Sequence, residues 1–360
     1  MISTSTTYQP DIAIHPGETL EENLKALSMS QSELSDRTGL ALKTVNEIVK
    51  GKNAITPQTA IKLERAMGIS SSFWNNLQKQ YDETLARLEA ENSLADEIEH
   101  TKKFTCYSEL ARYGLVERTN NWHVRTQSLL RFFGIDSFAY LMQVQSAAFR
   151  RKQRDSISPE NLAAWLRWGE IQADALETRE FDKSSVQQLI PNFRTLTRSK
   201  DEKVWRRLQG TCANMGIAVV FVPTLKCTGV NGATRWKGDK AILQLSDRYK
   251  RDDAVWFTFF HELCHILRHG KKQQFVEWKN DGDVSQEEQE ADAFARDTLI
   301  PPKEYAEFAG QGDFSAHAIT RFANAIGISE SVVSGRLAKE GCISWQIAQS
   351  YTSKIAIRTS

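Results

Sequence analysis

The stretch HELCH, residues 261–265, contains two histidines four positions apart with a glutamate between them. On a helix, residues four apart lie one turn apart on the same face, so the imidazoles of His261 and His265 could bind one metal ion. Glu262 lies about 100° around the helix from His261, where its carboxylate could reach a water molecule on that ion without binding the ion itself. This combination is typical of zinc-dependent hydrolysis.

A catalytic zinc ion needs a third protein ligand, and the acidic segment SQEEQEADAFARDTLIPP, residues 285–302, could supply it. The candidates are Glu287, Glu288 and Glu290. We select Glu288, because it shares a helical face with Ala291 and Ala295, whose small side chains would let this helix approach the histidines closely. Glu290 remains the alternative ligand.

The remaining parts of such a site can be placed in the same way. Asp292, one turn after Glu288, could hold the second ring nitrogen of a ligand histidine. A zinc ion lowers the pKa of bound water to about 7, and Glu262 could take the proton and return it to the leaving amine of a peptide. A donor for the developing oxyanion is also needed, and His269 and Tyr305 are the candidates.

A second chemical feature lies near the N-terminus, in SQSELSDRTGLALKTVNEIVKGKNAIT, residues 30–56. Apolar side chains recur there at helical spacing on both sides of Gly39, and Ser30 followed by Glu33 is a capping-box signature. Two helices joined by a glycine turn predict a helix-turn-helix. Its second helix, at about Leu42 to Lys50, would enter the major groove of DNA.

This geometry predicts which side chains would contact DNA. The side chains expected at base edges are Lys43, Thr44, Asn46 and Glu47. Those expected at phosphates are Gln31, Lys50, Lys52 and Asn53. Asn46 is suited to reading adenine. Such modules bind as homodimers to two half-sites, which predicts a palindromic operator. Because residues 11–80 are close to charge-balanced, a protein-binding three-helix module is the alternative.

Length, net charge and composition restrict the number of domains, the kind of DNA-binding surface and the location expected for this protein. A length of 360 residues allows two or three domains, and a net charge of +1 means that any positive surface for DNA must be local. The start of the chain lacks a secretory pattern and no apolar run could span a bilayer, so we expect a cytoplasmic protein without membrane contact. The five scattered cysteines are expected to be reduced thiols.

We therefore predict an α+β fold that is mostly α. Its regions are a helix-turn-helix bundle at 11–80, a helical middle at 81–200 and a metal-site domain with a small sheet at 201–342. The expected strands are 215–223 and 240–246, with a glycine-containing loop between them. Trp165 and Trp168 are expected in the core of the middle region.

Two segments of the middle region leave alternatives open. Residues 81–95 repeat apolar positions by four and three, which fits either a dimerising coiled coil or a plain connecting helix. The basic run at residues 150–154 is either a solvated helix end or a contact with nucleic acid.

Two stretches resemble known families. The segment from His15 to Asp82, including its FWNNLQKQYD ending, resembles the Xre-type helix-turn-helix of HigA-family antitoxins. Residues 211–337 resemble the ImmA/IrrE metallopeptidase family, through VVFVP, HELCH, the acidic run from Glu288 and LIPP. One departure is that Ala41 and Leu42 stand where serine and a polar residue usually begin the recognition helix, so the helix cap is weakened.

The resemblances imply a specific function. The first implies an autorepressor that binds operator DNA and neutralises a co-encoded HigB-like toxin. The second implies a zincin-like, zinc-dependent endopeptidase that cleaves a repressor or antitoxin, its own chain included. The alternative is a non-proteolytic antitoxin or repressor, whose metal site is structural or senses a ligand.

Overall fold

The structure is a computed structural model in which the chain forms two compact units, Met1–Glu99 and His100–Ser360. The described residues are 12–141, 157–199, 201, 203–270, 275–278 and 285–354. The basic run at residues 150–154 lies outside them. None of the described helices is both long and apolar enough to cross a membrane.

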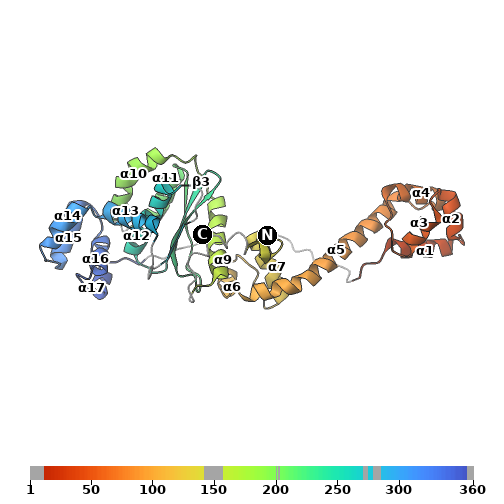
Figure 1. The fold of residues 1–360 in the computed structure, drawn as a ribbon, viewed down its shortest axis with the longest axis horizontal. Coiled ribbons are helices and arrows are strands. Elements are labelled where there is room, and N and C mark those ends of the chain that lie inside the picture. Colours follow the sequence, from red (N-terminus) through yellow and green to blue (C-terminus); the bar gives the residue numbers. More distant parts are fainter. Residues whose placement is uncertain are drawn as a thin grey trace. The chain divides into compact units, whose positions relative to one another are not determined.

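The first unit is a helical bundle (Figure 1). Its helices are α1 (Pro16–Ala26), α2 (Gln31–Thr38), α3 (Leu42–Val49), α4 (Pro57–Met67) and all but the last turn of α5 (Ser71–Lys102). α2 and α3 form the predicted helix-turn-helix, joined at Gly39, whose φ of 65° favours glycine. Ser30 caps α2 by accepting a hydrogen bond from the Glu33 backbone, whereas Ala41 gives α3 no side-chain cap.

Gly17 lets α1 pack closely against α3, the predicted recognition helix, and His15 caps the N-terminus of α1. A Cβ atom at Gly17 would lie 1.9 Å from the Ile48 carbonyl oxygen, so only glycine permits this approach of α1 to α3. His15, whose role the sequence did not reveal, caps α1: its Nδ1 accepts a hydrogen bond from the Gly17 backbone at 2.9 Å. Its ring packs edge-on against Tyr81. α5 continues through residues 81–95, and its dimerisation stays a prediction.

The second unit combines helices with one sheet. Its helices are α6 (Tyr107–Arg112), α7 (Trp122–Phe133), α9 (Pro159–Asp174), α10 (Lys183–Leu196), α11 (Val204–Ala213), α12 (Asp252–Arg268), α13 (Gln286–Leu299), α14 (Pro302–Gly310), α15 (Ala316–Ile326), α16 (Glu330–Lys339) and α17 (Trp345–Gln349). Its strands are β1 (Ile217–Phe221), β2 (Val230–Lys237), β3 (Lys240–Leu245) and β4 (Phe275–Trp278). The predicted fold class, mostly α with a small sheet, is confirmed.

The sheet has the order β1-β3-β2-β4, with β1 parallel to β3 and the other pairs antiparallel. The two expected strands are β1 and β3, but the prediction of a loop between them is wrong, because half of that segment is β2. A glycine-rich polar segment does not predict a strand by itself. Here β2 forms a hairpin with β3, closed by a turn at Gly238 with φ of 59°, and β3 supplies its hydrogen-bonding partners.

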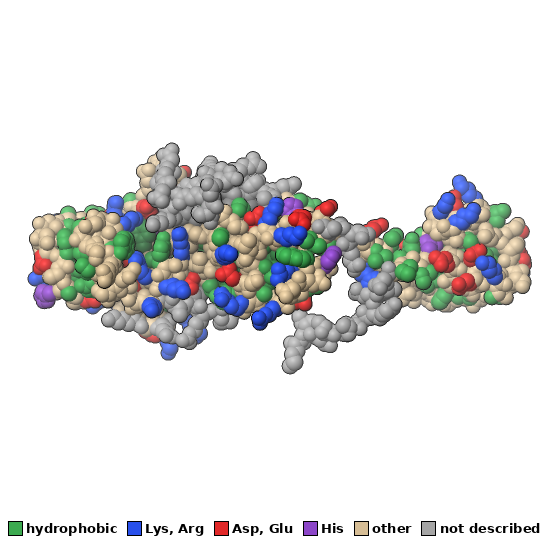
Figure 2. Space-filling model, turned by 90° about the horizontal axis from the view of Figure 1, so that it is seen from below, with side chains coloured by type: hydrophobic (Ala, Val, Ile, Leu, Met, Phe, Trp, Pro, Cys, Tyr) green, Lys and Arg blue, Asp and Glu red, His purple; other side chains and the backbone are tan. Residues whose placement is uncertain are grey.

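Both faces of the sheet are covered (Figure 1). Ile217 and Val219 point into the core formed with α11 and α12, while Ala218 and Val220 point to the opposite face, which α9 covers. Strands buried on both faces commonly have long apolar runs, and β1 has such an unbroken run. Charged side chains of both signs are interspersed over the outside (Figure 2), consistent with the small net charge.

A buried polar network holds α9 against the sheet. Arg235 donates to the Leu166 carbonyl at 2.7 Å and to Gln244 Oε1 at 2.9 Å, and Gln244 Nε2 donates to the Trp165 carbonyl at 2.7 Å. Trp165 and Trp168 are buried in the core that the middle region shares with β2, as predicted. The boundary proposed at residue 200 stays a prediction.

This network generates a prediction about two glycines. A Cβ atom at Gly169 would lie 1.9 Å from Gln244 Oε1, and Gln244 is locked by its hydrogen bonds. We expect Gly169→Ala to lower the free energy of unfolding by about 1–3 kcal/mol. The matched control is Gly210→Ala, because a methyl group added at this exposed helical glycine would meet no neighbour within 4 Å. The control should be neutral or stabilising by up to about 1 kcal/mol. Urea denaturation measures both, and equal effects would contradict the predicted clash.

Candidate metal centre

Helix α12 carries the HELCH residues into the interior of the second unit. The sheet lies against one side of α12, and α13 and α16 pack against the others. Two acidic side chains, Asp252 and Asp253, lie in its first turn, where they interact favourably with the positive end of the helix dipole. The helix ends before Gly270, whose φ is 77°. His261, Glu262 and His265 are consequently all buried.

Three side chains converge at one point between α12 and α13. Donor atoms of His261, His265 and Glu288 all lie within 4.8 Å of one another. The two Nε2 atoms are 3.1 Å apart, and the Glu288 carboxylate lies 3.3 Å from His261 Nε2 and 3.8 Å from His265 Nε2. Within the described part of the chain, no fourth histidine, cysteine or carboxylate joins this group.

The group fits a zinc ion. Two zinc–nitrogen bonds of about 2.0–2.1 Å at a tetrahedral angle would place the nitrogens about 3.4 Å apart, close to the observed separation. The set of two imidazoles and one carboxylate matches the three protein ligands of catalytic zinc sites, which leave one position for water. The role of these residues as ligands stays a prediction.

Small side chains on α13 allow this convergence. Ala291 and Ala295 are fully buried on the α13 face that meets α12, so the two helix backbones can approach closely. Glu288 lies on this same face and therefore reaches the histidines. Glu290 points elsewhere: its carboxylate contacts Arg268 at 2.6 Å and His269 at 3.2 Å, outside the group.

The second ring nitrogen of each histidine also has a partner. Asp292 Oδ1 lies 3.0 Å from His261 Nδ1, and His269 Nδ1 lies 2.8 Å from His265 Nδ1. These contacts direct both Nε2 atoms toward Glu288. Burial, together with the two neighbouring imidazoles, lowers the pKa of His265 to about 2, so the ring is neutral and able to bind a metal. Although burial opposes it, the hydrogen bond from His261 holds the pKa of Asp292 below its ordinary value.

Strand β2 positions Glu262. The Thr234 hydroxyl donates to Glu262 Oε2 at 2.6 Å, which orients the buried carboxylate. On the same strand, a Cβ atom at Gly232 would lie 2.8 Å from Glu262 Oε1 and 2.5 Å from Thr258, so only glycine leaves room there. Neither contribution was predicted from the sequence, since a loop was expected in this segment. An isolated glycine between β-compatible residues is the signal that could have indicated a close approach.

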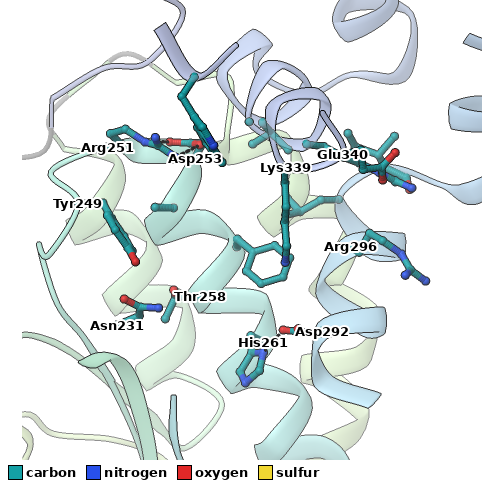
Figure 3. A pocket seen from close by; sticks show the side chains of 18 of the residues that line it. Asn231, Tyr249, Arg251, Asp253, Thr258, His261, Asp292, Arg296, Lys339 and Glu340 are labelled. Atoms are coloured by element: carbon teal, nitrogen blue, oxygen red, sulfur yellow. Dashed lines mark hydrogen bonds and ion pairs between the residues drawn. The ribbon is translucent and has the colours of Figure 1, made fainter. Parts of the chain in front are cut away.

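A cavity of about 770 Å³ opens beside the metal-binding group (Figure 3). His261, Glu288 and Asp292 form part of its wall, and α16 and the first half of α12 form much of the remainder. Asn231 and Tyr249 lie on the opposite side and were not identified from the sequence. A cavity of this size admits several residues of an extended peptide.

Neither of the two proposed oxyanion donors lies where that role requires. His269 is held between His265 and Glu290, away from the cavity wall. Tyr305 donates its hydroxyl proton to Glu340 at 2.6 Å, and burial together with that carboxylate raises its pKa. The structure therefore places neither candidate at the cavity, because the sequence alone does not reveal which partners the residues at a helix end contact.

The predicted DNA-contacting residues lie on α2, on α3 and directly after α3, and none of them is buried. Lys43 is almost fully exposed and only loosely paired with Glu47, at 3.8 Å. The side chains of Lys50, Lys52 and Asn53 are also exposed. The half-buried residues of the set are Gln31, Thr44, Asn46 and Glu47. Leu42, at the first position of α3, is 48% exposed and presents an apolar side chain where a polar one is usual.

Comparison with known proteins assigns the two parts to families. Residues 20–74 match the helix-turn-helix family, and residues 212–338 match the IrrE N-terminal-like domain. Virulence-associated protein I of Dichelobacter nodosus is 40% identical over 75 residues, which are 21% of this chain and 69% of that protein. The uncharacterized HTH-type transcriptional regulator YddM of Escherichia coli K12 is 36% identical over 66 residues, 18% of this chain and 70% of its own length.

A solved structure of a HigA-family addiction module antidote protein from Coxiella burnetii is 34% identical, with a TM-score of 0.22, covering 23% of this chain and 92% of that one. The chain belongs to the helix-turn-helix family through its N-terminal part. It also contains an IrrE N-terminal-like domain, a type of domain that suggests a metallopeptidase. Both resemblances seen in the sequence are thereby confirmed.

The geometry predicts a difference between two glutamates on α13. Glu288→Gln should weaken zinc binding by more than about 100-fold, because it removes a ligand charge from the buried group. The matched control, Glu290→Gln, should weaken it by about tenfold or less, since Glu290 acts only through His269. Competition with a chromophoric zinc chelator measures both affinities. A larger loss for Glu290→Gln than for Glu288→Gln would assign Glu290 to the ligand set instead, and equal losses would contradict the predicted difference.

Proposed function

We propose that this protein is a DNA-binding regulator of the antitoxin type whose second unit is a zinc-dependent endopeptidase. The observation that carries the proposal is the convergence of His261, His265 and Glu288, with Glu262 on the same helix and a cavity alongside. The substrate would be a repressor or antitoxin, its own chain included. Such a target fits a chain that also carries a helix-turn-helix.

In this mechanism zinc, held by His261, His265 and Glu288, would supply Lewis acidity and lower the pKa of a bound water molecule. Glu262 would accept the proton of the attacking water and return it to the leaving nitrogen. The hydrogen bond from Thr234 keeps the Glu262 carboxylate in one orientation. The carboxylate would therefore already be in position for proton transfer when the substrate binds.

The first unit would bind a palindromic operator as a homodimer in the cytoplasm. The exposed start of α3 supports entry into the major groove, where Asn46 can make two hydrogen bonds to adenine. Lys50 and Lys52 follow the helix and can contact phosphates. A co-encoded HigB-like toxin would be the second protein partner.

One observation favours a non-proteolytic alternative. Glu262 has no exposed surface, and His261 and His265 are each only 1% exposed. A group this enclosed would also suit a structural metal site or a site that senses a ligand. In that case the protein would regulate transcription without hydrolysing any peptide.

Substitution of Glu262 separates the two functions. Glu262→Gln should retain zinc but lose cleavage by about 10²–10⁴-fold, because the amide cannot accept the proton. The zinc-loaded protein, mixed with purified Xre-type repressors and with its own chain, can be followed by gel electrophoresis and mass spectrometry. Glu307→Gln, a change at an exposed position, is the control and should cleave normally. Identical gels for the wild type and Glu262→Gln would support the non-proteolytic function.

Two substitutions test the DNA interface in different ways. On an operator selected from random DNA, Asn46→Ala should cost about 1–3 kcal/mol and relax the preference for one base pair. Lys52→Ala should weaken binding to all sequences alike and reduce the salt dependence by about one counterion. Fluorescence anisotropy over a range of salt concentrations distinguishes these outcomes. A wild type that binds no DNA would indicate a protein-binding module.

A further inference from the structure

The cavity beside the metal centre is lined by four cationic side chains. They are Arg251, Arg296, Arg336 and Lys339. Each arginine is engaged by a carboxylate of the chain. Arg251 contacts Asp253 at 2.8 Å, Arg336 contacts Glu340 at 3.0 Å, and Arg296 contacts Asp297 at 2.6 Å. Among the described residues, no carboxylate lies within ion-pair distance of the fourth, Lys339.

The placement of Lys339 is specific. It lies at the end of α16, and its Nζ atom is 4.9 Å from the centre of the Phe257 ring, a cation–π contact that holds the ammonium over α12. Phe257 lies one turn before His261, and their ring centres are 6.4 Å apart. In Figure 3 the Lys339 side chain extends from α16 toward the side of the cavity where His261 and Asp292 lie.

The charge of Asp292 acts on Lys339, but no acidic group among the described residues of the cavity forms a direct ion pair with this lysine. Asp253 and Glu340 are paired with arginines, and Asp292 is hydrogen-bonded to His261. Glu288 belongs to the metal-binding group. A ligand that brings its own carboxylate into the cavity could therefore form the direct ion pair that Lys339 lacks among the described residues, in a partly enclosed space where such pairs are stronger than on an open surface.

We infer that Lys339 binds a carboxylate of the peptide substrate, so that the endopeptidase selects an acidic side chain close to the scissile bond. This inference rests on the proposed function and names its substrate class. Lys339 is exposed to the cavity, whereas the metal-binding group is buried. It therefore contacts a side chain of the bound peptide, and the peptide carbonyl lies deeper, at the metal-binding group.

Two arms of one experiment test this selection. In the first, the zinc-loaded wild type digests a random decapeptide library, and mass spectrometry reads the residues around the cleaved bonds. Glu and Asp should be enriched about tenfold over Gln and Asn at one position. In the second, the Glu262→Gln protein retains peptides from the same library on a column, which measures binding without cleavage. The same acidic enrichment is expected.

Variants assign the enrichment to one side chain. Lys339→Met should abolish the preference for acidic residues, and Lys339→Glu should replace it with a preference for Lys and Arg. Lys303→Met, which removes an exposed lysine that does not line the cavity, should leave the enrichment unchanged. Circular dichroism would establish that all three variants are folded.

The outcomes separate the inference from the function on which it rests. Cleavage or retention without acidic enrichment overturns the inference and leaves the endopeptidase intact. A uniform fall in kcat for all peptides in Lys339→Met, with the enrichment unchanged, also overturns it and assigns the lysine to the oxyanion. Acidic retention without any cleavage supports the carboxylate subsite and overturns the endopeptidase.

Discussion

The candidate metal-binding group of His261, His265 and Glu288 depends on the close packing of α13 against α12. Two histidines one turn apart make a site only if a third donor comes from another element, and here that donor is Glu288 on α13. The fully buried alanines at 291 and 295 allow the approach. A larger side chain at either position would hold the helices apart and move the carboxylate away from the imidazoles. Packing volume, rather than electrostatic attraction, thus fixes the geometry of the donors.

The environment of the donors then determines their chemistry. Burial keeps the His265 imidazole neutral, and partners on the Nδ1 side of both histidines leave the Nε2 atoms directed inward. The proposed general base, Glu262, is positioned by a different element, since Thr234 on β2 donates a hydrogen bond to it and Gly232 on β2 leaves room for it. The sheet therefore contributes directly to the site, while its other face anchors the middle region through the Arg235 network.

In the first unit, the important packing contact is between α1 and α3. Gly17 lets α1 contact the end of α3, and His15 caps α1 two residues before Gly17. The recognition helix α3 is therefore held in place by its packing against α1. Its own N-terminus lacks a side-chain cap at Ala41. The rigidity of α3 therefore comes from tertiary contacts of Val45 and Ile48 in the core more than from local capping.

Local sequence determined much of this protein. Helical spacing predicted the pair of histidines with Glu262 beside them and the helix-turn-helix around Gly39. It also predicted the helical face of small alanines on which Glu288 lies. These features could be predicted because each depends on residues within a few helical turns of one another. Tertiary structure decided the rest. β2 was not predicted, because its polar and glycine-containing sequence forms a strand only when β3 supplies the hydrogen-bonding partners. The positions of His269, Tyr305 and Lys339 depend on contacts with residues distant in sequence, which are Glu290, Glu340 and Phe257. Such contacts are set by how whole elements pack, and no local pattern encodes them.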